Sequence, residues 1–182
     1  LWRAGHAIVD AGLGVMEVAL RAPGVLEAFG QLVARVDDAG LPLTVGAGTV
    51  LDVAAAEAAI DAGARFVFSP VLDPEVGTLC QTQNVAWFPG CATPSEVHIA
   101  LELGCDAVKL FPADLLGGPR LLRSLTSVFG EFPAIPSGGI DPQAGDVEAW
   151  FGAGAVAVGA GSSLFPAGAS SSHSSRDASS QP

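Results

Sequence analysis

Short apolar stretches alternate with segments of helical periodicity along most of the chain. The apolar stretches are rich in Val, Leu, Ile and Phe, and Gly or Pro lies at the ends of most of them, as is typical of buried strands. The seven predicted strands are residues 13–20, 43–50, 65–70, 85–90, 107–112, 132–140 and 155–161. They recur about every 20 to 25 residues, a spacing that leaves room for one helix between neighbours.

Helical spacing is clearest in residues 2–11 (WRAGHAIVDA), 54–63 (AAAEAAIDAG) and 95–104 (SEVHIALELG). The second and third segments close on a glycine, which commonly stops a helix. Regular alternation of strands and helices predicts a parallel sheet with crossover helices, and continuously apolar strands predict burial on both faces.

We expect an α/β fold of the (β/α)8 TIM-barrel type, with an open doubly wound sheet as the alternative. The near-uniform repeat and the polar residues at strand ends favour the barrel. The chain opens with a helix and closes with a strand, so the first strand and the last helix of an eight-strand barrel are expected to be missing. Such an opening would expose strand edges. We assign residues 1–166 to the barrel domain and 167–182, which are rich in Ser and Ala, to a disordered tail.

Composition narrows the range of partners. The 182 residues are 49% hydrophobic, which suits one globular domain, and the net charge of -11 argues against nucleic acid or an anionic membrane as a partner. No apolar run reaches the roughly 18 to 20 residues of a membrane helix. Cys80, Cys91 and Cys105 lack C-x-x-C spacing, and no secretory signal pattern opens the chain, so we expect reduced thiols in a cytoplasm. The cysteines and histidines show no metal-ligand spacing, and we expect no metal.

Lys109 is the only lysine of the chain and lies in the middle of the predicted strand AVKLFP. Burial disfavours the charged ammonium, so the pKa of Lys109 should fall and leave a nucleophilic amine. The alternative is a structural lysine that pairs with a carboxylate or extends its ammonium to solvent.

Glu17 and Arg21 lie in and just after the strand VMEVAL, four positions apart. Two-residue alternation places both side chains on the same face of the strand. They form either a buried structural ion pair or a functional pair, in which the carboxylate transfers protons and the guanidinium binds a substrate carboxylate.

Glycine-rich strand ends occur late in the chain, at residues 137–140 (SGGI) and 159–163 (GAGSS). In TIM barrels the loops after the last two strands often present backbone amides to a phosphate, and glycine permits the close approach. An earlier turn, VGAGTV, places the Thr49 hydroxyl at a strand end, where it binds a carboxylate or caps the next helix.

The ordered series MEVALR, VGAGTVLD, FSPVLD, FPGCATPSE, VKLFPAD, PSGGI and VGAGSSLF resembles the class I 2-keto-3-deoxy-6-phosphogluconate (KDPG) and 4-hydroxy-2-oxoglutarate (KHG) aldolases. The resemblance spans roughly residues 4 to 166, and VGAGTV and KLFPA are its most specific parts. It implies a (β/α)8 barrel, a homotrimer, and cleavage of a phosphorylated 2-keto acid to pyruvate and glyceraldehyde 3-phosphate without a cofactor.

The resemblance also implies roles for individual residues. Lys109 corresponds to the Schiff-base lysine and Glu17 to the glutamate that shuttles protons. The corresponding substrate-binding positions are Arg21, Thr49, Pro89, Phe111, Ser137, Gly138, Gly139, Gly161 and Ser162. Ser137 and Ala19 stand where many relatives have Thr, and a further arginine of the family's first strand is absent.

Three other functions remain open at this point. A 2-keto-3-deoxy-6-phosphogalactonate aldolase is the nearest, although that branch tends to lack the arginine that corresponds to Arg21. A non-catalytic remnant that only binds a sugar phosphate is the second. A phosphate-binding epimerase or synthase barrel is the third, and it would leave the buried Lys109 unexplained.

Overall fold

A computed structural model describes residues 1–142, 145–161 and 164 of the chain. Helices and strands alternate through these residues, as the sequence pattern predicts. The helices are α1 (Trp2–Asp10), α2 (Val25–Ala39), α3 (Val53–Asp61), α4 (Pro74–Thr82), α5 (Pro94–Glu102), α6 (Pro119–Phe129) and α7 (Asp146–Phe151). The strands are β1 (Val15–Ala19), β2 (Thr44–Gly48), β3 (Phe66–Phe68), β4 (Ala86–Phe88), β5 (Gly90–Cys91), β6 (Val108–Leu110) and β7 (Ala134–Pro136).

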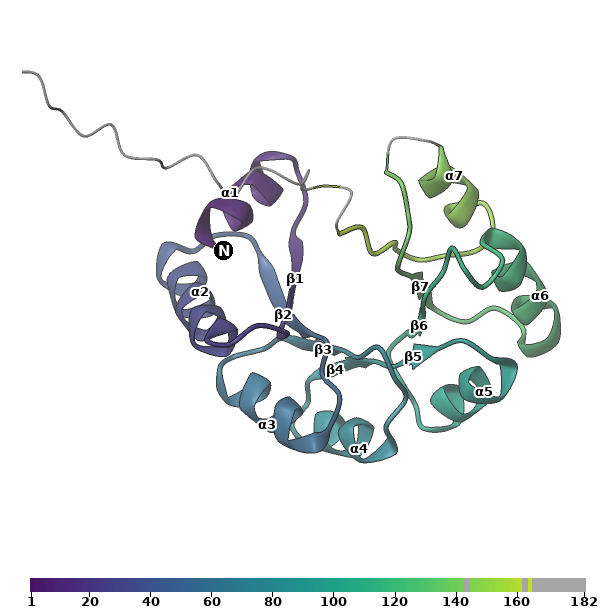
Figure 1. The fold of residues 1–182 in the computed structure, drawn as a ribbon, viewed down its shortest axis with the longest axis horizontal. Coiled ribbons are helices and arrows are strands. Elements are labelled where there is room, and N and C mark those ends of the chain that lie inside the picture. Colours follow the sequence, from purple (N-terminus) through teal and green to yellow (C-terminus); the bar gives the residue numbers. More distant parts are fainter. Residues whose placement is uncertain (143–144, 162–163, 165–182) are drawn as a thin grey trace, which may run out of the picture.

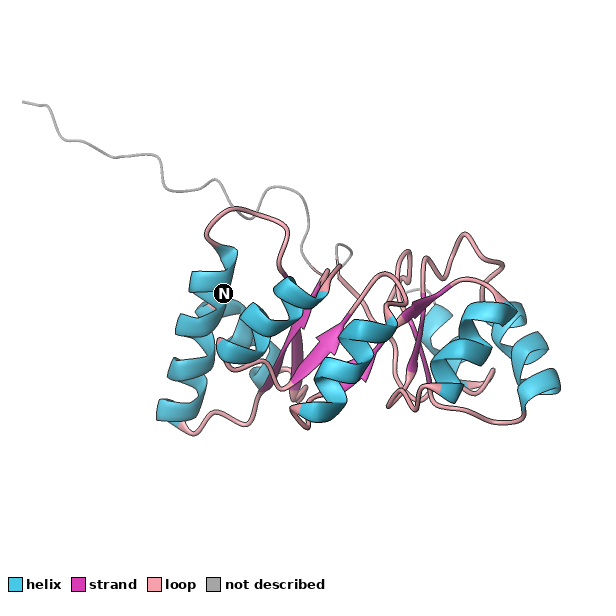
Figure 2. Ribbon diagram, turned by 90° about the horizontal axis from the view of Figure 1, so that it is seen from below, coloured by secondary structure: helices cyan, strands magenta, loops and turns pink. Residues whose placement is uncertain are grey.

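The strands line the inside of a ring and the helices cover its outside (Figure 1). Every strand pairing is parallel, in the order β1-β2-β3-β4 and β5-β6-β7. A view at right angles shows helices along the outer face of the strands (Figure 2). This arrangement is of the TIM-barrel type and confirms the predicted fold class. The open doubly wound sheet has helices on both faces and does not describe it.

The predicted strand 85–90 is divided in two, which corrects that prediction. Pro89 lies between β4 and β5 and has no N–H with which to continue a ladder. The amide of Gly90 instead donates to the carbonyl of Val71 at 3.2 Å. A Cβ at Gly90 would collide with the backbone of Pro70, so only glycine fits at this crossing of the two chain segments.

The predicted strand 155–161 is not a regular strand. It runs beside β7 through one isolated parallel bridge between Ser137 and Gly159, and the amides of Val156 and Gly159 donate to Ala134 and Pro136. A strand needs neighbours on both sides to be fully paired inside a barrel. Among the described strands, this segment hydrogen-bonds to β7 alone.

The ring is open between β1 and β7 (Figure 1). Within the described residues β1 pairs only with β2, so its other edge has no strand beside it. Val15 of β1 is 63% exposed and Val156 is 58% exposed, because neither meets a neighbouring strand across the opening. The predicted tail at 167–182 lies outside the described residues.

Two apolar cores hold the barrel. The first packs β1 to β4 against α1 to α4, and the second packs β5 to β7 against α5 to α7. Cys105 borders both cores. In the part of the chain that the structure describes, no helix is long and apolar enough to cross a membrane.

Candidate active site

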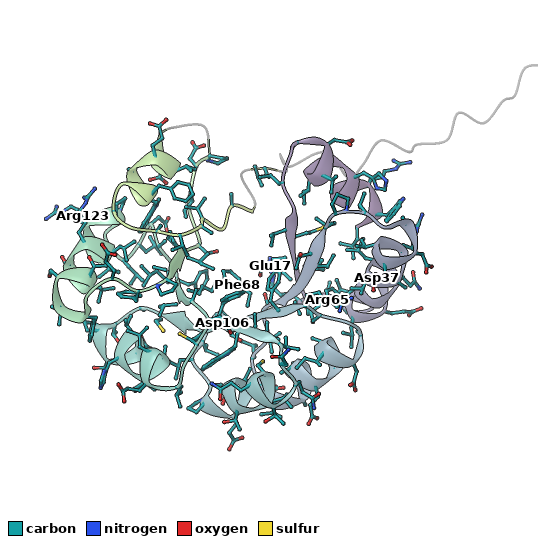
Figure 3. The ribbon with its side chains drawn as sticks, turned by 180° about the vertical axis from the view of Figure 1, so that it is seen from behind. Glu17, Asp37, Arg65, Phe68, Asp106 and Arg123 are labelled. Carbon is teal, nitrogen blue, oxygen red and sulfur yellow. The ribbon has the colours of Figure 1, made fainter. Side chains whose placement is uncertain are left out.

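Lys109, Glu17 and Phe68 come from three strands and share the inner face of the barrel. In the strand register Glu17 lies beside Gly46, Gly48 beside Phe68, and Gly90 beside Lys109. Figure 3 shows Glu17 and Phe68 directed into the centre of the ring. Glu17 belongs to the first half of the barrel and Lys109 to the second, so the site depends on how the two halves are joined.

Lys109 is buried, with 5% of its surface exposed. Its Nζ lies 3.8 Å from the centre of the Phe68 ring and 5.0 Å from that of Phe111. Burial lowers the pKa of Lys109 from 10.5 to about 8, and the negative charge of Glu17 opposes this fall. No ion pair within 4 Å joins Lys109 to Glu17. The amine thus neither extends to solvent nor forms a close ion pair with Glu17 in this structure.

Glu17 faces the open interior and remains accessible to solvent. Its carboxylate rests on the backbone of Gly48, where any Cβ would overlap it. The surrounding protein raises the pKa of Glu17, while Lys109 and Arg21 act in the opposite direction. Solvent on one side moderates these effects, and a carboxyl with a raised pKa is the kind of group that can take and return a proton.

A pocket of about 670 Å³ opens beside Glu17. Seven of the predicted site residues line this pocket: Glu17, Arg21, Phe111, Ser137, Gly138, Gly139 and Gly161. Arg21 is exposed and forms no ion pair within 4 Å with Glu17. The buried structural ion pair considered from the sequence is thus absent, and the guanidinium is open to an anion in the pocket.

The glycine loop after β7 offers backbone donors to this pocket. Gly138 and Gly139 have φ values of +92° and +77°, which side chains rarely adopt, and a Cβ at Gly139 would overlap the Asp114 carboxylate. The amides of Gly138, Gly139 and Gly161 donate to no described residue. Unpaired amides around a concave surface suit an anion such as phosphate. Ser162 lies outside the described residues.

Thr49 is held in an unusual conformation at the end of β2. Its φ is +60°, and for a β-branched residue this region is strained, at a cost on the order of 1–3 kcal/mol. The Thr49 amide donates to Phe68. It does not cap α3, because Asp52 does so by accepting from the Ala55 amide at 2.8 Å. Helix capping is therefore not the role of Thr49.

Three predicted site residues do not line the 670 Å³ pocket: Lys109, Thr49 and Pro89. Lys109 nevertheless interacts with two residues that do line the pocket. Its Nζ lies 5.0 Å from the centre of the Phe111 ring, and its charge acts on Glu17. Pro89 is fully buried, and its carbonyl accepts the Lys109 amide at 2.9 Å. Pro89 thus supports the lysine strand from behind.

The cysteines are held in the thiol form. Cys80 and Cys91 are buried, and burial raises the pKa of Cys91 to about 12 and that of Cys80 to about 11. Cys91 is 1% exposed and packs in the second apolar core. Among the residues with described positions, no group of three or more His, Cys, Asp or Glu side chains is placed to hold a metal ion.

Sequence reasoning missed several residues around the site. Ile140, Asp141, Gly159 and Ala160 line the pocket, and Phe68 contacts the lysine amine. The segment RFVFSP contained a signal for Phe68, since alternation puts Phe66 and Phe68 on one face. Which face points inward, however, depends on the register with β2.

Comparisons with known proteins agree with this arrangement. A sequence profile described as KDPG and KHG aldolase matches residues 2–177. The 2-dehydro-3-deoxy-phosphogluconate aldolase of Zymomonas mobilis is 41% identical over 137 residues, covering 75% of this chain and 64% of the relative. The 2-dehydro-3-deoxy-6-phosphogalactonate aldolase of Escherichia coli K12 is 32% identical over 165 residues, covering 90% of this chain and 78% of the relative.

A solved structure is similar throughout the barrel. The KDPG aldolase of Legionella pneumophila, with pyruvate captured at low pH as a covalent carbinolamine intermediate, matches with a TM-score of 0.79 and 30% identity. The match covers 92% of this chain and 80% of that one. The present chain spans 64%, 62% and 59% of the length of three curated phosphogluconate aldolases that it matches.

Proposed function

This chain belongs to the KDPG and KHG aldolase family, and we propose that it is a class I aldolase that cleaves 2-keto-3-deoxy-6-phosphogluconate to pyruvate and glyceraldehyde 3-phosphate. A side activity on 4-hydroxy-2-oxoglutarate, giving pyruvate and glyoxylate, is part of the same proposal. The observation that carries it is the buried Lys109, whose amine faces the barrel interior with a pKa of about 8. Roughly a tenth of such an amine is neutral at pH 7, far more than of an ordinary lysine, and this neutral fraction can attack a ketone.

The first half of the proposed reaction builds an electron sink. The lone pair of the Lys109 Nζ attacks the C2 carbonyl of the substrate, and the oxygen accepts a proton to give a carbinolamine. Loss of that oxygen as water leaves an iminium with a C2–N double bond. Glu17, whose pKa is raised by its surroundings, supplies the proton that the departing water requires. The Legionella relative, captured as a carbinolamine with pyruvate, supports this step.

The second half breaks the carbon–carbon bond. Glu17 takes the proton of the C4 hydroxyl, the C3–C4 bond breaks, and its electron pair moves to the iminium to form an enamine. The C4 fragment leaves as glyceraldehyde 3-phosphate. Glu17 then returns a proton to C3, and water hydrolyses the resulting iminium to pyruvate and free Lys109. One carboxyl thus serves both proton transfers, in keeping with its place on the inner face of β1.

The two ends of the substrate would bind to different groups. Arg21 and Thr49 are proposed to hold the keto-acid carboxylate, since the guanidinium is open to the pocket. The unpaired amides of Gly138, Gly139 and Gly161 are proposed to hold the phosphate, with Ser137 and Ser162 adding hydroxyls. Phe111 is proposed to form the wall beside the Lys109 amine. Pro89 is proposed to support the strand that carries Lys109, through the hydrogen bond that its carbonyl accepts. Phosphate binding far from C2 then orients the reacting carbon.

The direct test is capture of the Schiff base. The protein is incubated with pyruvate, reduced with borohydride, and measured by intact mass and peptide mapping. Because Lys109 is the sole lysine, mapping separates its adduct from one at the N-terminal amine. We expect a reduced pyruvyl adduct on Lys109. Lys109→Arg keeps a cation there but forms no Schiff base, and should give no adduct. No adduct in folded wild-type protein would favour the non-catalytic remnant.

A galactonate substrate is the second candidate, because the Escherichia coli relative with 32% identity is named for it. The two substrates are C4 epimers, so kcat/KM for each, measured on one preparation, decides between them. We expect the phosphogluconate epimer to be favoured, because Arg21 is present. A higher kcat/KM for the phosphogalactonate epimer would reverse the assignment.

We propose further that the chain acts in the cytoplasm as a homotrimer. Leu115 and Val128 are 79% and 75% exposed, and such apolar side chains are available for contacts between subunits. Sedimentation equilibrium should give three times the mass of the 18.2 kDa chain. A monomer at working concentration would contradict the trimer without affecting the chemistry.

A further inference from the structure

The ring of Phe68 lies under the amine of Lys109. The Nζ is 3.8 Å from the centre of the ring, well inside the range of a cation–π contact, whereas Phe111 is at 5.0 Å. Phe68 ends β3 and faces the interior beside Gly48 (Figure 3). The lysine amine therefore rests on an aromatic face donated by a strand of the other half of the barrel.

Other aromatic side chains fix the Phe68 ring in place. Its centre is 6.0 Å from that of Phe88 at an interplanar angle of 71°, and Phe88 in turn lies 5.6 Å from Phe66. Edge-to-face contacts of this kind are favourable beyond simple burial. A Cβ at Gly46 would overlap the Phe66 ring, so this aromatic cluster needs glycine on β2. The ring under Lys109 is thus held by packing.

Few charged or titratable groups surround the amine. Glu17 from β1 acts on it across the interior, and Arg21 beyond β1 acts on Glu17. Cys91 on the neighbouring β5 keeps its proton, because burial raises its pKa to about 12. None of these makes an ion pair within 4 Å of Lys109. The Phe68 ring, with its centre at 3.8 Å, therefore lies closer to the amine than any carboxylate of the described residues does.

We propose that Phe68 is a positioning residue for Lys109, whose ring face orients the amine and favours its cationic forms. The inference rests on the proposed Schiff-base function. A π face attracts a cation less strongly than an adjacent carboxylate does in a buried site, so the amine still loses its proton readily. The same face lies under the nitrogen when it becomes the cationic iminium. The ring thus stabilises the charged intermediate without competing as a nucleophile or a base.

The test measures the Lys109 pKa directly and needs no activity. Protein containing 13C- and 15N-labelled lysine gives signals from one side chain, because the chain has one lysine. The titration is followed by NMR in wild type and with 3,4,5-trifluorophenylalanine at position 68, which keeps the ring shape but weakens its negative face. We expect the pKa to fall by about 0.5 to 1 unit. An unchanged pKa or a rise would overturn the proposal, because the negative face of the ring would then not favour the charged amine.

Matched variants separate the ring from general packing. Fluorination at Phe66, in the same cluster but without a contact to the amine, should leave the Lys109 pKa unchanged. Phe68→Leu, which removes the ring, should lower the Lys109 pKa as fluorination does. Phe68→Tyr, which keeps an aromatic ring, should leave it at the wild-type value. If Phe66 fluorination shifts the pKa equally, the effect belongs to packing and the proposal fails.

Pyruvate capture distinguishes this inference from the proposed function. In wild type an adduct on Lys109 tests the function, whereas the NMR titration tests the ring. With both correct, the pH profile of adduct formation in the fluorinated protein shifts by the same amount as the NMR midpoint. A shifted NMR midpoint with no adduct in wild type refutes the aldolase reaction but leaves the cation–π contact standing. An adduct with an unshifted midpoint refutes the role of Phe68 alone.

Discussion

Replacement of Lys109 by methionine should stabilise the protein most at neutral pH and progressively less in alkali. Lys109 has a pKa of about 8 in the folded state against 10.5 ordinarily, so the native protein binds fewer protons than the unfolded chain between these values. Stability that depends on Lys109 therefore rises with pH through this window. Below about pH 8 the folded protein carries a buried ammonium, and its cost is present in full.

The size of the effect follows from the two pKa values. A difference of 2.5 units between 10.5 and about 8 corresponds to about 3 kcal/mol when both states are protonated. At pH 7 nearly all of this cost remains, and at pH 9.5 about 1.4 kcal/mol remains. The difference in free energy of unfolding between Lys109→Met and wild type should thus decrease by about 2 kcal/mol between pH 7 and pH 9.5.

Urea unfolding, followed by the fluorescence of the buried tryptophans Trp87 and Trp150, measures this difference. The comparison is made at each pH, so titration of the cysteines cancels. Repeating it with Glu17→Gln in both proteins removes the partner charge that Lys109→Met would leave behind. A gap between variant and wild type that stays constant with pH would show that Lys109 titrates normally, and the argument for a nucleophilic amine would fail.

Three further predictions follow from the site. Gly48→Ala should displace the Glu17 carboxylate and reduce aldol cleavage at least about 100-fold in a steady-state assay, whereas Gly14→Ala, with 3.6 Å to its nearest neighbour, should not. Thr49→Gly should raise the free energy of unfolding by about 1 kcal/mol, because relief of the strained φ outweighs the entropy that glycine adds to the unfolded chain. The same variant should capture less pyruvate. A loss of stability would argue against strain at this position. The three thiols, with pKa values of about 11 to 12, should react with a disulfide reagent at pH 8 at least about 100-fold more slowly than in the unfolded chain, and equal rates would contradict the burial.

Much of the barrel could be predicted from local pattern. Six of the seven predicted strands contain observed strands. Helices α3 and α5 end two residues before Gly63 and Gly104, which have positive φ, in agreement with the predicted glycine stops. These features depend on side chains a few residues apart, so periodicity and turn chemistry suffice to specify them. The predicted strand 155–161 failed because strand formation depends on partners elsewhere in the chain.

The site was predictable in its residue types but not in its contacts. Lys109 and Glu17 stood out because charges inside apolar strands are costly. The left-handed conformation of Thr49, the buried position of Pro89 and the ring of Phe68 under the amine had no clear sequence signal. Each of them arises where two segments distant in sequence meet.

Residue chemistry and short-range spacing are enough to specify the alternation of strands and helices, the single lysine within a strand and the glycine-rich loop after β7. Three features depend instead on contacts between distant segments: the strand faces that share the interior, the interaction of Glu17 with Lys109 across the two halves, and the Phe68 ring under the amine. Register sets these contacts, and a shift of one residue would turn every side chain of a strand to its other face.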